Sequence, residues 1–261
     1  MRWLFLAVPV PILGCMMILM AIGFAVGGTL LVRRLCPVRV LKAHHDITGP
    51  MFGTVGVLYA VLLAFIVIVA WQSFDKAAGD VVREANYYGD VYRNSVGLDA
   101  AFRSKLRTAM DVYLNSVIED EWPRLATGGM SKSAQQNALE VWALVGACQP
   151  QSEASRIFLA ETVHRMNLAG EMRRQRLMNA RNGIHPVLWL VLYMGAAITM
   201  GFAFCFGAES RRTHLAMNAM LALLITLILF TVHVLDTPFG GTMGITAEPF
   251  CQVLAGARAM L

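Results

Sequence analysis

Four long stretches of the chain contain no Asp, Glu, Lys or Arg, and a segment rich in charge separates the second stretch from the third. The uncharged stretches are residues 3–32, 47–74, 182–208 and 213–235. A helix needs about 20 apolar residues to cross the hydrocarbon layer of a membrane. Apolar residues run continuously here rather than alternating with polar ones, which favours helices over barrel strands. We therefore predict four membrane-spanning helices.

We place the four spans at residues 3–32, 51–71, 186–206 and 215–235. Trp3, Trp71 and Trp189 lie near the predicted membrane interfaces, where amphipathic rings are favoured. The first stretch is too long for the apolar core of a signal peptide and ends in Arg33-Arg34 rather than in small residues. We expect it to remain as a membrane span.

The segment between the second and third spans has the composition of a water-facing domain. Residues 72–184 carry 14 Lys and Arg against 13 Asp and Glu. Apolar residues recur there at spacings of three and four, which predicts helices near 72–96, 100–117, 131–147 and 153–181. Asp99, Ser131 or Ser133, and Ser152 are the expected helix starts. The first of these helices should continue the second span without a break.

The predicted fold class is all-α: a polytopic membrane protein with four transmembrane helices, two plus two, around a helical extramembrane domain. We divide the chain into spans 1 and 2 (1–71), the extramembrane domain (72–184), spans 3 and 4 (185–235) and a tail (236–261). The tail contains two Pro-Phe pairs and clustered glycines. Such backbone avoids lipid unless protein covers it, which predicts an interfacial or re-entrant segment.

Composition narrows the function by exclusion. Only 15% of residues are charged, against about 25% in soluble domains. The net charge of +5 lies mainly at the membrane edges without interleaved aromatics, so we expect no nucleic-acid partner. The five cysteines show no metal-binding spacing, and we find no catalytic motif. We predict no enzyme, no cofactor and no metal, and interpret Glu119-Asp120-Glu121 as a solvated helix end and His44-His45 as ordinary interfacial residues.

Small residues form a continuous stripe on the second span. The members are spaced by three or four positions and so share one helix face: Gly49, Gly53, Gly56, Ala60 and Ala64. Stripes of this kind let helices approach closely in lipid. One interpretation is packing within the chain. The other is a subunit interface or pore lining, in which Phe52, Phe65 or Ile68 would form an apolar constriction.

Two polar groups lie next to the third and fourth spans. Four arginines precede the third span: Arg173, Arg174, Arg176 and Arg181. They would contact lipid headgroups or acidic helix starts, or else line a vestibule that attracts anions. His233 lies within the fourth span and Asp236 at its end, where polar groups are costly and often functional. The alternatives are that His233 extends its ring towards the membrane interface or forms a hydrogen bond with a neighbouring helix, and that Asp236 caps the turn after the span.

The order of several short motifs carries a resemblance over nearly the whole chain. They are Trp71 followed by Glu84-Ala85 and Val91-Tyr92-Arg93, then Glu121-Trp122-Pro123, Arg173 to Leu177, Gly183 to Pro186 with Trp189, Leu235-Asp236-Thr237-Pro238-Phe239, and Pro249-Phe250. In this order they resemble the bestrophin-like family of bacterial membrane proteins, a domain family of unknown function. Thr237 departs from the pattern, which often has a basic residue there. The family name implies a link to bestrophins, which are homo-oligomeric anion channels with four spans per subunit.

The main functional hypothesis is a homo-oligomeric, anion-permeable ion channel with its pore lined by the second span. Its partners would be the lipid bilayer, further copies of the chain and inorganic ions. The alternative is a non-conducting membrane scaffold or sensor whose helical domain binds a partner. We expect the bacterial inner membrane. If only Lys and Arg in the short loops are counted, the positive-inside rule places the domain outside the cytoplasm. If Lys and Arg next to the spans are included, the rule places the domain in the cytoplasm. The resemblance also indicates a cytoplasmic domain, and we favour this orientation.

Overall fold

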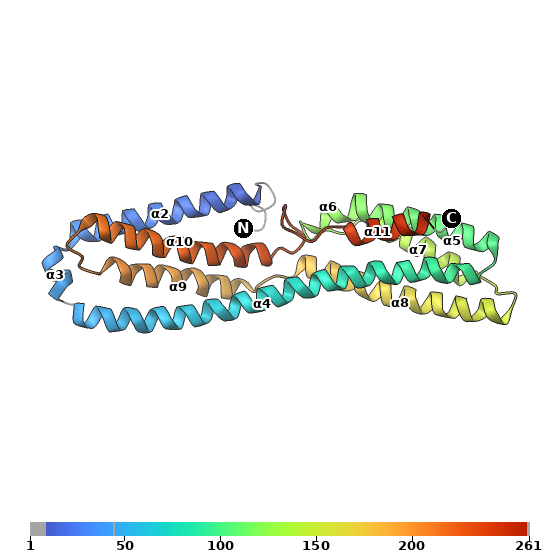
Figure 1. The fold of residues 1–261 in the computed structure, drawn as a ribbon, viewed down its shortest axis with the longest axis horizontal. Coiled ribbons are helices and arrows are strands. Elements are labelled where there is room, and N and C mark those ends of the chain that lie inside the picture. Colours follow the sequence, from blue (N-terminus) through green and yellow to red (C-terminus); the bar gives the residue numbers. More distant parts are fainter. Residues whose placement is uncertain (1–8, 44, 260–261) are drawn as a thin grey trace. The chain divides into compact units, whose positions relative to one another are not determined.

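The structure is a computed structural model that describes residues 9–43 and 45–259, in which helices follow one another without any strand (Figure 1). Trp3, His44 and the start of the first predicted span lie outside these residues. The helices are α2 (Val10–Leu35), α3 (Val38–Ala43), α4 (His45–Asn94), α5 (Ala100–Ser116), α6 (Trp122–Leu125), α7 (Lys132–Gly146), α8 (Glu153–Arg181), α9 (Pro186–Phe204), α10 (Arg211–Leu235) and α11 (Glu248–Arg258). Two short turns join them: η1 (Ser95–Gly97) is a 3-10 helix and η2 (Val117–Glu121) is a π-helix.

The described chain divides into two compact units. The membrane unit comprises residues 9–73 and 184–236, and the extramembrane unit comprises residues 74–183 and 237–259. Four helices in the described residues are long and apolar enough to cross a membrane: α2, α4, α9 and α10. The predicted four-span, all-α fold is confirmed.

Helix α4 passes from one unit into the other without interruption. Its 50 residues include the second predicted span and the first helix of the extramembrane segment. Glycine at position 79 destabilises the helix by about 1 kcal/mol relative to alanine. This is too little to break a helix that packs against other helices both before and after Gly79. The single long helix predicted from the sequence is therefore present.

Close approach and neutral polar bonds hold the membrane unit together. A Cβ added to Gly28 of α2 would lie 2.4 Å from the ring of Phe204, and one added to Gly195 of α9 would lie 2.5 Å from the ring of Tyr59. The Tyr59 hydroxyl donates to the carbonyl of Leu192 at 3.0 Å. These glycines are needed because lipid gives apolar side chains no incentive to be buried, so close helix contact supplies the attraction.

The extramembrane unit packs its helices around an apolar core, and the caps lie where the sequence predicts them. The Asp99 carboxylate accepts from the backbone N–H of Ala101 at the start of α5, and the Ser131 and Ser152 hydroxyls cap α7 and α8. The core includes Val81, Ala85, Val91, Leu106, Met110, Tyr113, Leu114, Val141, Met166 and Phe250.

The C-terminal tail packs into this core. Phe250 is fully buried and Leu254 is 5% exposed, both on α11. The Trp122 indole N–H donates to the carbonyl of Ile245 at 3.1 Å, and its ring packs edge-on against Phe239 and Phe250. The segment that we expected at the membrane interface or re-entering the membrane is thus a structural part of the extramembrane unit, because its Pro-Phe pairs place aromatic rings against Trp122.

Candidate functional site

The small-residue stripe of α4 faces away from the other helices of the membrane unit. In this stretch the buried face of α4 is formed by Tyr59, Leu63, Ile66 and Ala70. A Cβ added at Gly49, Gly53 or Gly56 would meet no atom within 4 Å from elsewhere in the described chain. Ala60 and Ala64 are exposed. Packing within the chain is therefore the wrong interpretation for the described residues, and contact between subunits or pore lining remains.

The three apolar residues that we considered for a constriction do not lie on one face. Phe52 packs edge-on against Phe206, with ring centroids 5.2 Å apart. Phe65 and Ile68 point outward and are 64% and 51% exposed. A helix turns about 100° per residue, so positions 52, 65 and 68 fall on different sides. A constriction formed by α4 stays a prediction, and the outward-facing Phe65 and Ile68 are its candidates.

The polar groups at the end of α10 connect that helix to the beginning of α9. His233 Nε2 lies 2.5 Å from the hydroxyl of Tyr193, and its ring stacks on Trp189 with centroids 3.9 Å apart. Asp236 Oδ1 accepts a hydrogen bond from the backbone N–H of Ile184 at 2.5 Å. A helix–helix hydrogen bond is one of the alternatives considered for His233. A functional role for His233 and Asp236 remains a prediction.

The four arginines that precede the third span divide into two groups. Arg174 and Arg181 are exposed, and Arg181 Nε donates to the carbonyl of Gly128 at 3.1 Å. Arg173 and Arg176 are only 8% and 0% exposed. A buried guanidinium that is paired with a carboxylate cannot attract ions from water. We therefore correct the proposed vestibule set: Arg173 and Arg176 do not belong to it.

Arg173 and Arg176 instead form a buried charge cluster with two glutamates, Glu84 of α4 and Glu121 of η2. Arg176 Nε and Nη2 donate to the Glu84 carboxylate at 2.7 and 3.1 Å, and Nη2 also reaches Glu121 Oε1 at 2.9 Å. Arg173 Nη2 donates to Glu121 Oε2 at 2.6 Å, and its Nη1 donates to Gln135 Oε1 at 2.7 Å. The two positive and two negative charges sum to zero, and their mutual attraction offsets the cost of removing the four side chains from water.

Aromatic rings enclose the guanidinium of Arg176. Its central carbon lies 5.2 Å from the ring centre of Trp122 and 5.7 Å from that of Phe250, within range of a cation–π attraction. Burial by itself lowers the pKa of Arg176, but the charges and hydrogen bonds of Glu84 and Glu121 outweigh it and raise that pKa above its usual value. Arg176 of α8 therefore stays charged. It connects α8 to α4 through Glu84 and to η2 through Glu121, and Phe250 of α11 packs against its guanidinium.

The π-helical turn η2 changes the direction of Glu121. A π-turn adds one residue to a helical turn and so rotates the side chains that follow it. Glu121 is fully buried, which makes our interpretation of the 119–121 run as a solvated helix end wrong for this residue. Its neighbour Asp120 faces the solvent side, where hydrogen bonds from Ser131 and Ser133, together with Arg124, lower the pKa of Asp120 to about 2.

Sequence reasoning missed the pairing of these four residues, although one signal was present. Glu84 lies among Val81, Ala85 and Tyr88, at spacings of three, one and four along a largely apolar helix face. A carboxylate on such a face requires a buried partner. The arginine group on α8 could have been proposed as that partner, because Arg173 and Arg176 are three positions apart and so share a helix face. Glu121 gave no such signal, because the π-turn shifts its face.

Comparison with known proteins identifies the family of this chain and similar folds. A sequence profile of the Bestrophin-like domain matches residues 19–250. The chain belongs to the Bestrophin-like family. Its fold is also similar to a crystal structure of a bacterial bestrophin homologue from Klebsiella pneumoniae, with 11% identity, a TM-score of 0.68 and coverage of 93% of this chain and 98% of that chain. A point variant of that homologue gives 12% identity, a TM-score of 0.66 and the same coverage. A search of curated proteins finds no match.

The Bestrophin-like match includes the candidate site residues described above. It spans the small-residue stripe of α4, the buried charge cluster and the end of α10, and its last residue is Phe250, which covers Arg176. Family membership and the four long apolar helices together identify an integral membrane protein. At identities near 11%, the solved homologues establish the fold.

Proposed function

We propose that this Bestrophin-like protein is a homo-oligomeric ion channel, permeable to anions, in which α4 lines the pore. One observation carries the proposal: the small-residue face of α4 is open. A Cβ added at Gly49, Gly53 or Gly56 would meet no atom within 4 Å from elsewhere in the described chain. Small residues on a membrane helix allow a second helix to pack closely or leave room for a pore. Here the second helix would belong to another copy of the chain, or the pore would lie between copies.

Assembly of several copies would bring these α4 faces around a common axis. A ring of such helices leaves a path between them where side chains are small and narrows it where they are large. Ile68 follows Ala64 by four positions, so it lies closer to this face than Phe65 does, and it would supply an apolar constriction that gates by dewetting. The buried charge cluster would hold the continuation of α4 in place through Glu84.

Charge supports anions as the permeant ions. The chain carries a net charge of +5. Among the arginines before the third span, Arg174 and Arg181 are exposed and would form the vestibule that raises the local anion concentration. Basic residues also lie in the last turn of α2, at Arg33 and Arg34. Exchanging Arg174 for glutamine should lower the ratio of chloride to sodium permeability measured from reversal potentials.

The proposed location is the bacterial inner membrane, with the extramembrane unit in the cytoplasm. Arginines next to the spans favour this side. A reporter fused after residue 261 tests it. Alkaline phosphatase activity with no fluorescence from a matching green fluorescent protein fusion would place the unit outside and reject the proposal.

Reconstitution tests conduction directly. Purified protein in liposomes should pass chloride, measured with a chloride-sensitive dye inside the vesicles. Gly53→Leu should lower the flux by about fivefold or more, because it places a branched side chain on the proposed pore face. Gly23→Leu is the matched control, since Gly23 on α2 is also exposed and a Cβ there meets nothing within 4 Å. Equal flux from the two variants would remove α4 as the pore helix.

Oligomeric state separates this proposal from its rival. Native mass measurement should give a closed ring of identical chains. A monomer, or the absence of flux for any ion under varied calcium, pH and voltage, would contradict the channel. Either result would favour a non-conducting scaffold or sensor that acts through its extramembrane unit.

A further inference from the structure

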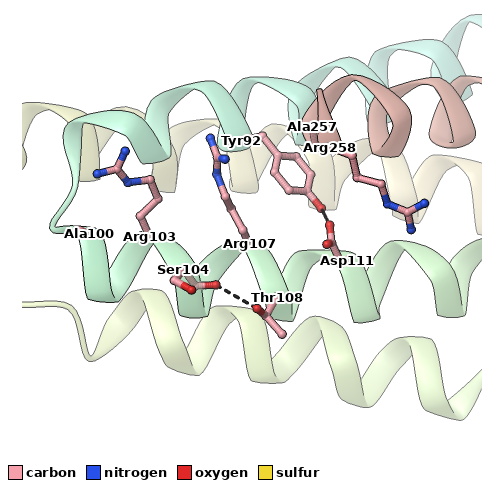
Figure 2. Close-up of a pocket in the computed structure, with 9 residues that line it drawn as sticks. All are labelled: Tyr92, Ala100, Arg103, Ser104, Arg107, Thr108, Asp111, Ala257 and Arg258. Carbon is pink, nitrogen blue, oxygen red and sulfur yellow. Dashed lines mark hydrogen bonds between the residues drawn. The ribbon is translucent and has the colours of Figure 1, made fainter. Parts of the chain in front are cut away.

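A surface groove of about 470 Å³ opens in the extramembrane unit between α5 and the end of α11. Figure 2 shows three arginine side chains along it: Arg103 and Arg107 project from α5, and Arg258 projects from α11. Tyr92 of α4 lies between the latter two. The groove therefore gathers guanidinium groups from two helices that are distant in sequence.

The positive charge of the groove is not balanced by its own residues. Three arginines and one carboxylate, Asp111, line it, which leaves a formal charge of +2. Asp111 Oδ1 already accepts a hydrogen bond from the hydroxyl of Tyr92 at 2.5 Å. Arg103 and Arg258 have no ion pair within the described residues.

Other arginines of the same unit show that this arrangement is unusual. Most lie within 4 Å of a carboxylate: Arg83, Arg93, Arg124, Arg156, Arg165, Arg173 and Arg176. In the groove, Arg107 Nε donates to the hydroxyl of Ser95 at 3.2 Å, which fixes the direction of its side chain while leaving its charge uncompensated. Three like charges gathered with one counter-charge repel one another, so the groove is complementary to an anion.

Guanidinium groups also define the kind of anion. Each presents a planar fork of N–H donors that matches two oxygens of a phosphate or carboxylate. A single chloride ion brings one negative charge to a groove with a formal charge of +2, whereas a molecule with two or more charged oxygen-bearing groups can balance that charge and accept from donors on both helices. We propose that the groove binds a small soluble polyanion of the diphosphate or polycarboxylate class.

Titration calorimetry of the full-length protein in neutral detergent tests this, with pyrophosphate as the probe at constant ionic strength. The wild type should bind pyrophosphate more tightly than inorganic phosphate. Arg103→Gln and Arg258→Gln should each weaken binding by about tenfold or more, the usual effect of losing a hydrogen-bonded charge. Arg103→Lys keeps the charge but loses the fork, and should fall between Arg103→Gln and the wild type.

Lys105→Gln is the matched control, because Lys105 is exposed on the same helix and does not line the groove. It removes the same charge and should change the affinity by less than about twofold, as expected of an exposed site. Equal losses from Lys105→Gln and Arg103→Gln would show diffuse attraction and overturn the site. Thermal unfolding of each variant confirms that the fold is kept, since neither Arg103 nor Arg258 has an ion-pair partner to lose in the described structure.

The source of the oxyanion is tested separately, because a phosphate on a lipid headgroup has the same chemistry. Pyrophosphate binding should be unchanged when the protein is moved into nanodiscs of neutral lipid. Arg103-dependent binding that occurs only with phosphatidic acid in the disc would assign the groove to a headgroup and overturn the soluble ligand. Absence of any binding at millimolar pyrophosphate would overturn the proposal as a whole.

Discussion

None of the buried side chains in the described membrane unit is Asp, Glu, Lys or Arg, whereas buried charged side chains join helices in the core of the extramembrane unit. Asn218 of α10 donates to the hydroxyl of Thr29 on α2 at 2.8 Å, and Tyr59 donates to a backbone carbonyl. In the extramembrane unit, fully buried Arg176 pairs with Glu84 and with Glu121. Among the buried side chains of the described residues, ion pairs therefore join helices in the extramembrane unit and not in the membrane unit.

The two units also differ in the side chains that they expose. Large apolar side chains of the membrane unit point outward, and Leu19, Met20 and Met220 are each about 70% exposed. Lipid solvates such side chains as well as protein does, so helix contacts must come from small residues and hydrogen bonds. Water makes apolar burial favourable in the other unit, and that gain offsets the desolvation of a charge cluster that fixes how α4, η2 and α8 meet.

The largest expected effect comes from removing one partner of the buried charge cluster. Arg176→Met leaves two buried carboxylates with one guanidinium and should reduce the free energy of unfolding of the extramembrane unit by about 3–5 kcal/mol. Urea unfolding of the detergent-solubilised protein, followed by tryptophan fluorescence, measures it. Arg174→Gln is the control on the same helix, and its exposed side chain should contribute less than about 0.5 kcal/mol.

A second substitution separates lost charge balance from lost packing. Adding Glu84→Leu to Arg176→Met leaves Arg173 with Glu121 as a neutral pair, so part of the stability should return. If the double variant is as unstable as Arg176→Met alone, the cluster acts through shape and not through charge.

A smaller effect is expected at the glycine contact of the membrane unit. Gly195→Leu forces the ring of Tyr59 away and should lower the free energy of unfolding by about 1–3 kcal/mol, as overpacking does. Gly53→Leu makes the same chemical change where no other part of the described chain lies within 4 Å, so the monomer should keep its stability. Thermal unfolding followed by fluorescence compares them. Destabilisation of the monomer by Gly53→Leu would show that the open face of α4 is covered.

Local patterns in the sequence predicted most of the fold. Windows free of charge marked the four spans, and Asp99, Ser131 and Ser152 marked helix starts, because spans and caps depend on neighbouring residues. The packing of the tail and the burial of Glu121 were missed. Both depend on contacts between distant segments: Phe250 meets Trp122, and Arg176 meets Glu121.

The candidate site was predicted less completely for the same reason. Helical spacing grouped Gly49, Gly53 and Gly56 correctly on one face of α4, but only the structure shows that this face is open. The arginines before the third span were recognised as a group, whereas their division into exposed and buried members depends on Glu84, 92 positions before Arg176. Spacing along a helix predicts which residues share a face, but it does not predict which other segments pack against that face.

The smallest expected effect is at the neutral bond between Asn218 and Thr29. Both are buried, and Thr29 also donates its own hydroxyl to the carbonyl of Ala25 at 2.7 Å. Losing Asn218 therefore leaves Thr29 with a partner, unlike Glu84 after loss of Arg176. A double-mutant cycle of Asn218→Leu with Thr29→Val should give a coupling of about 0.6 kcal/mol, typical of hydrogen bonds between membrane helices. A coupling above about 2 kcal/mol would mean that the membrane unit depends on polar contacts as strongly as the extramembrane unit does, and the contrast between the units would fail.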